Sequence, residues 1–212
     1  MDITGYIITA IVGYLLGSIP TGYLVAKARG IDIRTVGSKN MGATNVFRTL
    51  GKGPGIFVLF VDASKGFIAA FCASELLLRW VGVKNTDPQL NQLICGIAAV
   101  LGHNYTCWLS FQGGKGIATT GGVFLALAPL AVGIATAAWV IVFVFTRYVS
   151  IASIVAAIAL PTAVCFTQQS KALCSIAIIL GVLAIYKHKA NIQRLIDGTE
   201  NRINFKKSEA SK

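Results

Sequence analysis

Long apolar runs with few charges dominate the chain, and they predict helices that cross a lipid bilayer. A helix needs about twenty apolar residues to span the hydrocarbon core. By this measure seven segments are candidate membrane helices: residues 3–26, 56–81, 90–109, 117–127, 131–145, 149–166 and 172–186. The fourth segment is short for a crossing and Pro129 separates it from the fifth, so residues 117–146 could instead form a re-entrant hairpin in a five-helix protein. In both versions the fold class is an all-α integral membrane protein.

The polar segments between these helices fall on one side of the membrane if each helix crosses once. With the N-terminus outside, the inner side receives residues 27–55, the loop 110–116, the turn at Arg147 and the chain from residue 187 onward. Sixteen of the 19 Lys and Arg residues then lie at the inner face, and only Arg79, Lys84 and Lys171 remain outside. Cytoplasmic loops carry such an excess of cations. We therefore expect one membrane domain, residues 1–200, and a polar cytoplasmic tail, residues 201–212.

The composition fits the same class of protein. Of the 212 residues, 55% are hydrophobic and only 13% are charged, whereas about a quarter of an ordinary soluble domain is charged. Such a chain is neither a typical soluble domain nor a disordered one. The 19 Lys and Arg outnumber the 8 Asp and Glu and leave a formal net charge of +11. We attribute this basic excess to one membrane face rather than to nucleic-acid binding.

The cysteines and the start of the chain carry two further expectations. Five cysteines stand singly in apolar surroundings, and an odd number without CxxC spacing favours neither a disulfide framework nor a zinc site. We therefore expect them to be small apolar residues in the core or facing lipid. Asp2 stands where a cleaved export signal would carry a positive charge, so we expect the first apolar segment to be retained.

The first cluster of polar residues follows the first helix, in the sequence GSKNMGATN at residues 37–45. Its glycines permit backbone conformations closed to other residues, and its hydroxyl and amide side chains supply hydrogen-bond donors. The candidate binding residues are Gly37, Ser38, Asn40, Gly42, Thr44, Asn45 and Arg48. Thr44 or Asn45 could cap a helix whose N-terminus adds to an anion site, with Arg48 one turn in. This pattern suits a phosphate, although a plain turn-rich loop fits the composition equally well.

The second cluster is Gly102-His103 in the third apolar segment, followed by FQGGKG at residues 111–116. Three glycines around one lysine let the backbone approach a ligand that the ammonium group also reaches. The candidates for phosphate binding are Gly113, Gly114, Lys115 and Gly116. The pattern is not a Walker A motif, because Leu109 and Gly116 stand where that motif needs Gly and then Ser or Thr. Glycines also serve plain packing of membrane helices, but the lysine among them favours the functional interpretation.

The third cluster is the basic segment 187–200, which follows the last apolar run. If this segment is helical, His188 and Asn191 share a face and Arg194 projects near Asn191, so that a histidine, an amide and a guanidinium line one pocket. The candidate residues are His188, Asn191, Arg194 and Glu200. A basic helix resting on anionic lipid would have a similar composition. Asp62 and Lys65 in the second apolar segment predict an ion pair, functional or merely neutralising, and we regard both as supporting residues.

Together these segments resemble one known family. Four motifs carry the resemblance: GSIPTG at residues 17–22, GSKNMGATN, GH followed by FQGGKG, and HKANIQRLIDGTE at residues 188–200. In order, spacing and sidedness they are similar to the bacterial acyl-phosphate:glycerol-3-phosphate acyltransferases, the PlsY family, over residues 5–200. One departure is at Lys39 and Met41, where the family often has Gly and Pro. This departure concerns the stiffness of the loop more than the candidate ligands.

The resemblance implies a multi-pass enzyme of the bacterial inner membrane, with seven helices and an active site that faces the cytoplasm. It implies transfer of a fatty acyl group from acyl phosphate to the 1-hydroxyl of sn-glycerol 3-phosphate, which gives lysophosphatidic acid and phosphate and opens phospholipid synthesis. Carried over by position, Ser38, Lys115, His188 and Asn191 are catalytic, and Arg48 binds phosphate.

The chemistry of the residues is consistent with this reaction. Both substrates bring a phosphate, and acyl phosphate is a mixed anhydride with a good leaving group, so little further activation is required. Neither His103 nor His188 has an acid at the His-x4-Asp spacing of other glycerolipid acyltransferases. Our hypothesis is that Lys115 and the loop N–H groups neutralise the phosphates, while Ser38, His188 and Asn191 orient the hydroxyl and the developing oxyanion. An acylated Ser38 would instead indicate covalent catalysis.

Two other classes of protein stay open as alternatives. A small transporter or channel for an anionic phosphorylated solute would also combine apolar helices with basic loops, but it should place its polar groups near the middle of the bilayer. A metal-dependent phosphatidyl or nucleotide transferase would need clustered acids, whereas the inner loops offer only Asp32, Asp197, Glu200 and Glu209. We therefore expect no metal, cofactor, nucleotide or nucleic acid. The expected partners are the two substrates and the bilayer, and a monomer is consistent with the sequence.

Overall fold

Helices are the only regular secondary structure in the described part of the chain. The computed structural model describes residues 3–73, 87–168 and 170–203, and within these ranges it contains helices, turns and loops but no strand. The chain folds into two compact units, Met1–Val132 and Gly133–Lys212, and each is described by itself. The all-α prediction is confirmed for the described residues.

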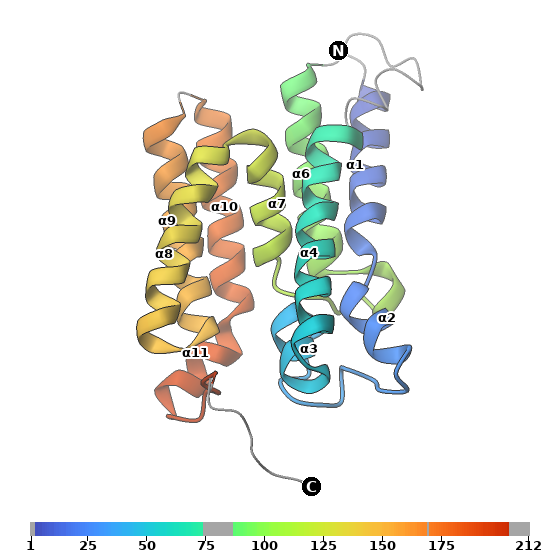
Figure 1. The fold of residues 1–212 in the computed structure, drawn as a ribbon. Coiled ribbons are helices and arrows are strands. Elements are labelled where there is room, and N and C mark those ends of the chain that lie inside the picture. The colour runs from blue at the N-terminus through green and yellow to red at the C-terminus, as the bar shows by residue number, and fades with distance from the viewer. Residues whose placement is uncertain (1–2, 74–86, 169, 204–212) are drawn as a thin grey trace, which may run out of the picture. The chain divides into compact units, whose positions relative to one another are not determined.

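The first unit is built around two pairs of closely packed helices (Figure 1). Its elements are α1 (Ile3–Ser18), α2 (Thr21–Lys27), α3 (Ala43–Leu50), α4 (Lys52–Ile68), the π-helical turn Ala69–Ala73, α6 (Pro88–Asn104), the 3-10 turn Cys107–Leu109 and α7 (Ile117–Leu127). Helix α1 packs on α6, and α4 packs on α7. Small residues allow this approach: a Cβ built on Gly17 would overlap the backbone of Ala99, and one on Gly122 would overlap the carbonyl of Ala63.

The ends of two helices follow from single residues. Helix α1 ends before Pro20, which has no backbone N–H to donate, and the chain resumes as α2 at Thr21. Helix α6 begins after Asp87, whose side chain accepts a hydrogen bond of 3.0 Å from the backbone N–H of Leu90. Pro88 occupies the first turn, where its missing N–H costs nothing. Local chemistry rather than the apolar pattern therefore sets these boundaries.

The second unit contains helix α8, a hairpin of two packed helices and a short helix that follows the hairpin at an angle. Its elements are α8 (Pro129–Thr146), whose first turn belongs to the first unit, and α9 (Val149–Thr167), α10 (Lys171–Lys187) and α11 (Lys189–Ile196). Helices α9 and α10 pack on each other, and α10 meets α11 with a bend of 52°. After α11 the chain folds back, since the backbone N–H of Ile203 donates to the carbonyl of Arg147 at 3.0 Å. The C-terminal motif is thus held at the turn between α8 and α9.

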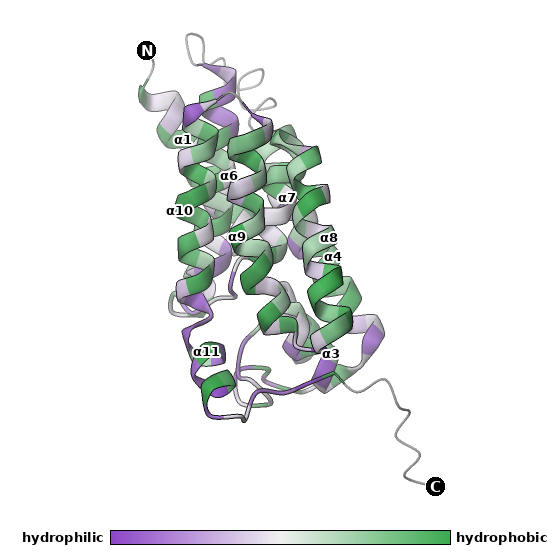
Figure 2. Ribbon diagram, turned by 90° about the vertical axis from the view of Figure 1, so that its left-hand side faces the viewer, coloured by the Kyte–Doolittle hydropathy of each residue, from purple (hydrophilic) through white to green (hydrophobic). Residues whose placement is uncertain are grey.

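The seven predicted apolar segments are helical over most of their described length, but the first is broken at residues 19–20 and the third at residues 105–106. Residues 74–81 of the second segment lie outside the described residues. In the described ranges, four helical segments are long and apolar enough to cross a membrane: Ile3–Lys27, Lys52–Cys72, Pro129–Thr146 and Val149–Thr167. A fifth is added if the bent pair α10–α11 counts as one span. Helix α7 has 11 residues, about 16 Å in length, which is too short to cross alone. Figure 2 shows helices that are hydrophobic over most of their length. Seven crossings and the orientation stay predictions.

Two of the five cysteines correct the expectation drawn from the sequence. Cys165, near the end of α9, and Cys174, near the start of α10, form a disulfide with their Cα atoms 5.0 Å apart. The two cysteines are nine positions apart and come together because α9 and α10 form a hairpin. The odd number of cysteines in the chain gave no indication of this pair. Cys72, Cys95 and Cys107 carry free thiols.

Candidate active site

One buried side chain organises residues 33–42, here called the serine loop. Asn45 in the first turn of α3 is 2% exposed, and its Oδ1 accepts a hydrogen bond of 2.9 Å from the backbone N–H of Ser38. Its Nδ2 donates to three carbonyl groups of the loop, those of Ile33, Val36 and Asn40, at distances of 3.2, 3.0 and 2.9 Å. Both polar atoms of the Asn45 amide are therefore used inside the protein. Asn45 shapes the loop that carries Ser38, and its predicted contact with a ligand stays a prediction.

The N-terminus of α3 differs from the one predicted. The capping residue is Gly42, not Thr44 or Asn45, and no side chain accepts a hydrogen bond at this cap. The amide of Asn45 is turned back toward the serine loop instead, while Asn40 Oδ1 accepts a hydrogen bond of 2.8 Å from the backbone N–H of Gly42. Arg48 falls in the last turn of this eight-residue helix. The capping prediction was wrong: Gly42 occupies the cap position, and the amide of Asn45 binds the serine loop.

Two left-handed backbone positions fix the turn around Ser38. Gly37 and Lys39 both have a φ of 58°, a conformation that costs an ordinary residue about 1–2 kcal/mol. A Cβ built on Gly37 would overlap the side-chain oxygen of Asn45, so this position has no room for a larger residue. Glycine adopts a left-handed backbone without steric cost, which is a physical reason for the glycine that the similar family often has at the position of Lys39.

Replacing Asn45 with aspartate is expected to destabilise the first unit. The new side chain keeps an acceptor for the backbone N–H of Ser38 but removes the donor that serves three carbonyl groups, and it buries a charge. We expect the melting temperature of the detergent-solubilised protein to fall by roughly 5–15 °C, since buried carbonyl groups lose their partners. Thr35→Ala is the control, because it removes an exposed hydrogen bond of the same loop. An unchanged melting temperature for Asn45→Asp would contradict this role.

Residues 113–116, here called the glycine loop, pack directly on the end of α6. The backbone N–H of Gly114 donates to the carbonyl of His103 at 2.9 Å. A Cβ built on Gly113 would overlap that carbonyl, and one on Gly114 would overlap the imidazole ring of His103. Gly116, with a φ of 82°, leads into α7. The glycines are thus required by packing, and the half-buried Lys115 is the only long side chain that this packing leaves in the loop.

The serine loop and the glycine loop belong to the same end of the first unit (Figure 1). Leu109, just before the glycine loop, packs in a single buried cluster with residues of α2, the serine loop, α3 and α4: Ala26, Ile33, Met41, Val46 and Val58. Ser38, Arg48 and Lys115 therefore lie on segments that are held at one end of this unit. That arrangement agrees with the sidedness predicted for the first two motifs.

In the second unit, Glu200 holds two of the predicted site residues. Glu200 is 7% exposed and accepts a hydrogen bond of 2.9 Å from Asn191 Nδ2 and one of 2.7 Å from Arg194 Nε. The backbone N–H groups of Thr199 and Glu200 also donate to the carbonyl of Arg194, which closes the turn. Both carboxylate oxygens are thus engaged by the protein, and an anionic side chain would repel a phosphate. These contacts favour a positioning role for Glu200 over the predicted contact with substrate.

His188 stands at the bend between α10 and α11, so residues 187–200 are not one helix. Its side chain is buried, and Nδ1 lies 2.7 Å from the carbonyl oxygen of Ala184. Because a carbonyl oxygen can only accept, this contact places the proton of the neutral ring on Nδ1 and leaves Nε2 with a lone pair. A histidine in this state can accept a proton from a hydroxyl group.

The carboxylate of Glu200 should make the fold sensitive to acid. Burial raises the pKa of Glu200, but hydrogen bonds from Asn191 and Arg194, with a smaller contribution from Ser150, outweigh it and hold the pKa below its ordinary value of 4.5. A carboxyl group whose pKa falls on folding stabilises the fold above its unfolded pKa, and this contribution is lost as the pH falls through the lower folded value. The melting temperature should therefore drop more steeply below pH 4.5 in the parent than in Glu200→Gln. Matching pH profiles would contradict this, and Asp197→Asn, at an exposed site, is the control.

The structure also assembles a buried cluster that the sequence only half predicted. The expected ion pair is confirmed, with Lys65 Nζ 2.9 Å from Asp62 Oδ1. His103 Nδ1 lies 3.5 Å from the same oxygen. The His-x4-Asp spacing along the chain does not reveal the contact between Asp62 and His103, because this contact forms between α4 and α6.

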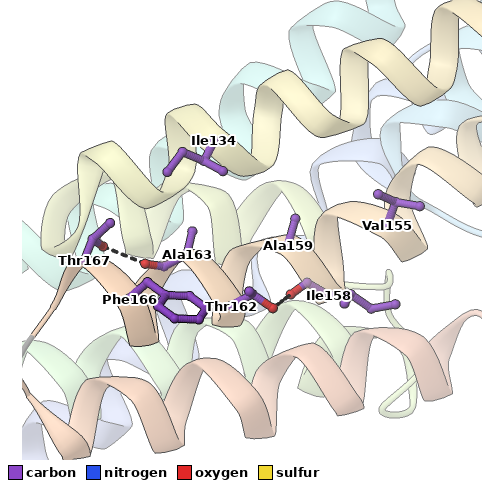
Figure 3. Close-up of a pocket in the computed structure, with 8 residues that line it drawn as sticks. All are labelled: Ile134, Val155, Ile158, Ala159, Thr162, Ala163, Phe166 and Thr167. Carbon is purple, nitrogen blue, oxygen red and sulfur yellow. Dashed lines mark hydrogen bonds between the residues drawn. The ribbon is translucent and has the colours of Figure 1, made fainter.

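A separate apolar groove lies in the second unit (Figure 3). It has a volume of about 480 Å³ and is lined by Ile134, Val155, Ile158, Ala159, Thr162, Ala163, Phe166 and Thr167. The two threonine hydroxyls donate to backbone carbonyls within α9, at 2.9 and 2.7 Å. The groove therefore presents apolar surface, and none of the candidate site residues lines it.

Apolar helices of membrane length with cation-rich and glycine-rich loops define an integral membrane protein that suits phosphorylated ligands. The family model described as glycerol-3-phosphate acyltransferase matches residues 7–198. Glycerol-3-phosphate acyltransferase of Geotalea daltonii is 48% identical over 93% of this chain and 97% of its own length. The enzyme of the same name from Fusobacterium nucleatum is 44% identical over 91% of this chain and 95% of its own length. The chain belongs to the glycerol-3-phosphate acyltransferase family, as the resemblance indicated.

Solved structures agree with this assignment. A crystal structure of PlsY, an integral membrane glycerol 3-phosphate acyltransferase, in its glycerol 3-phosphate form has a TM-score of 0.83 and 40% identity, covering 94% of this chain and 96% of that chain. The lysophosphatidic acid form of PlsY has a TM-score of 0.81 and 39% identity, covering 94% of this chain and 95% of that chain. The protein is thus a helical integral membrane glycerol-3-phosphate acyltransferase.

Proposed function

We propose that the protein transfers a fatty acyl group from acyl phosphate to the 1-hydroxyl of sn-glycerol 3-phosphate, giving lysophosphatidic acid and inorganic phosphate. The observation that carries this proposal is the set of three polar motifs on a chain of this family, each built from small residues, amides and cations. The similar protein PlsY is described in a glycerol 3-phosphate form and a lysophosphatidic acid form, which are a substrate and a product of such a reaction.

The choice of acyl phosphate as donor rests on charge and reactivity. Both substrates would then carry a phosphate, which matches the cations Arg48 and Lys115. The backbone N–H of Gly114 is used within the protein, so any backbone donor of the glycine loop must be another of its N–H groups. The acyl carbon of a mixed anhydride is already activated, and phosphate leaves readily. This step requires few carboxylates, and one histidine whose Nε2 carries a lone pair is sufficient to accept the proton.

The proposed step is a direct displacement at the acyl carbon. Oxygen 1 of glycerol 3-phosphate forms a bond to this carbon, and the bond from the carbon to the phosphate oxygen breaks, so that its electron pair leaves with phosphate. The hydroxyl proton passes to His188 Nε2 or to the departing phosphate. Ser38 and Asn191 orient the hydroxyl and the developing oxyanion, while Lys115 and Arg48 offset the phosphate charge. Glu200 acts through Asn191 and Arg194, which it holds.

The orientation is part of the proposal: seven crossings, the N-terminus outside, the polar motifs facing the cytoplasm, and residues 201–212 as a cytoplasmic tail of an inner-membrane protein. The distribution of Lys and Arg supports it. The disulfide between Cys165 and Cys174 adds support, because it lies at the turn from α9 to α10, which this arrangement places outside. Disulfides persist in oxidising compartments and are rare in the cytoplasm.

The test is a comparison of donors with purified protein. Labelled glycerol 3-phosphate is supplied with palmitoyl phosphate or with palmitoyl-CoA, and the labelled lipid is separated and its acyl position determined. Product from palmitoyl phosphate alone, acylated at position 1, is the expected result. Product from palmitoyl-CoA alone would overturn the donor, and uptake of labelled glycerol 3-phosphate into protein-containing vesicles without any acylation would favour the transporter alternative.

A further inference from the structure

Three ionisable side chains form a buried cluster inside the first unit. Asp62, Lys65 and His103 are 3%, 4% and 4% exposed. Asp62 Oδ1 is shared, since Lys65 Nζ lies 2.9 Å from it on one side and His103 Nδ1 lies 3.5 Å from it on the other. The cluster thus joins a carboxylate and an ammonium group of α4 to an imidazole of α6.

The ammonium end of the cluster is tied to the break between α1 and α2. Lys65 Nζ donates a hydrogen bond of 3.0 Å to the backbone carbonyl of Ile19. Pro20 follows Ile19 and ends α1, so this carbonyl lies where the regular helix stops. Lys65 therefore connects Asp62 to the segment that leads into α2 and the serine loop.

The imidazole end of the cluster lies against the glycine loop. The carbonyl of His103 accepts the hydrogen bond from Gly114, and the ring lies so close to Gly114 that Nε2 is the atom nearest to a Cβ built there. Asp62 faces Nδ1 on the opposite edge of the ring. A carboxylate beside one ring nitrogen attracts a protonated edge of an imidazole, so Asp62 favours the ring orientation that turns Nε2 toward the loop.

A purely structural role explains this cluster poorly. Placing a carboxylate, an ammonium group and an imidazole inside a membrane protein costs far more than placing apolar side chains of similar volume there. The contacts also run in one direction, from the α1–α2 break through Lys65 and Asp62 to His103 and then to the backbone beside Lys115. A pair that only neutralised itself would need no such connection.

We propose that Asp62, Lys65 and His103 form a positioning network that sets the conformation of the glycine loop and thereby places Lys115 for binding the phosphate of glycerol 3-phosphate. This inference rests on the proposed function and adds to it three residues that act through the loop rather than on the substrate. Loss of the network should weaken binding of glycerol 3-phosphate while leaving the transfer step nearly intact.

The test separates positioning from folding by removing both charges together. Asp62→Asn alone would leave Lys65 charged and buried, whereas the double variant Asp62→Asn with Lys65→Met is neutral. We expect the double variant to keep a melting temperature within about 5 °C of the parent, while its KM for glycerol 3-phosphate rises about tenfold or more and its kcat changes less than about threefold. His103→Asn should show the same split, because the shorter side chain places an amide near Asp62 and no longer reaches Gly114.

Thr9→Val is the matched control, since Thr9 donates a buried hydrogen bond between α1 and α6 to Asn91, away from the loop. It should alter the melting temperature but not the KM. An active parent with a normal KM in both the double variant and His103→Asn would overturn the inference and leave the proposed function standing. Equal losses of kcat and stability without a rise in KM would also overturn it. An inactive parent would overturn the proposed function and this inference with it.

Discussion

Lys115→Met is expected to lower kcat/KM for the acylation of glycerol 3-phosphate by about a thousandfold, which corresponds to about 4 kcal/mol of transition-state stabilisation. The methionine keeps a long unbranched stem, so packing among the glycines is preserved while the charge is lost. The effect is large because the phosphate in the transition state would lose the only charged side chain of the glycine loop. Steady-state kinetics with palmitoyl phosphate as donor measures it.

Two further variants serve as controls for Lys115→Met. Lys115→Arg keeps the charge but changes its geometry, and we expect it to recover part of the activity. Lys52→Met removes an exposed cation at the start of α4 and should stay within about twofold of the parent. Retention of more than about a tenth of the parental kcat/KM by Lys115→Met would show that Lys115 is not a phosphate ligand.

His188→Ala should lower kcat by about a hundredfold or more, with a smaller change in the KM for glycerol 3-phosphate. The contact between Nδ1 and the carbonyl of Ala184 holds the ring with Nε2 as the acceptor, so the variant loses both the proton acceptor and its orientation. Single-turnover measurements isolate the chemical step from product release.

The control for this variant is Gln193→Ala, which alters an exposed side chain of α11 and should keep full activity. The melting temperature of His188→Ala must also be measured, because His188 stands at the bend that begins α11. A folded His188→Ala protein with the parental kcat would exclude His188 from the reaction.

The helices could be predicted because their cause is local. Long apolar runs define them, and residues such as Asp87 and Ser170 supply the N-terminal caps that set where they begin. The number of crossings could not be obtained in the same way. Helix α7 has an apolar sequence but only 11 residues, and the span that begins at Ile3 is broken at Pro20.

The sequence proposes candidate residues for the site but does not give the contacts among them. Asn45 and Glu200 were expected to touch the substrate, yet the structure uses their polar atoms within the protein. An amide or a carboxylate has the same appearance in a sequence whether it binds a ligand or a loop. Only the fold shows which groups lie within hydrogen-bond distance of such a side chain.

Contacts between distant segments account for what the sequence left out. Asp62 and His103 meet because α4 and α6 belong to the same bundle, and a search along the chain at fixed spacing cannot detect such a pair. The disulfide between Cys165 and Cys174 arises in the same way, from a turn that places two helix ends side by side. In both cases the residue types were visible and their proximity was not.

The most direct test of the central claim is to measure lysophosphatidic acid and inorganic phosphate together in one reaction of the purified protein with palmitoyl phosphate and glycerol 3-phosphate. Direct acyl transfer predicts that the two products appear in equal amounts at equal rates, and that release of phosphate stops when glycerol 3-phosphate is omitted. Phosphate release at the same rate without glycerol 3-phosphate, or lysophosphatidic acid formed without phosphate, would contradict the account.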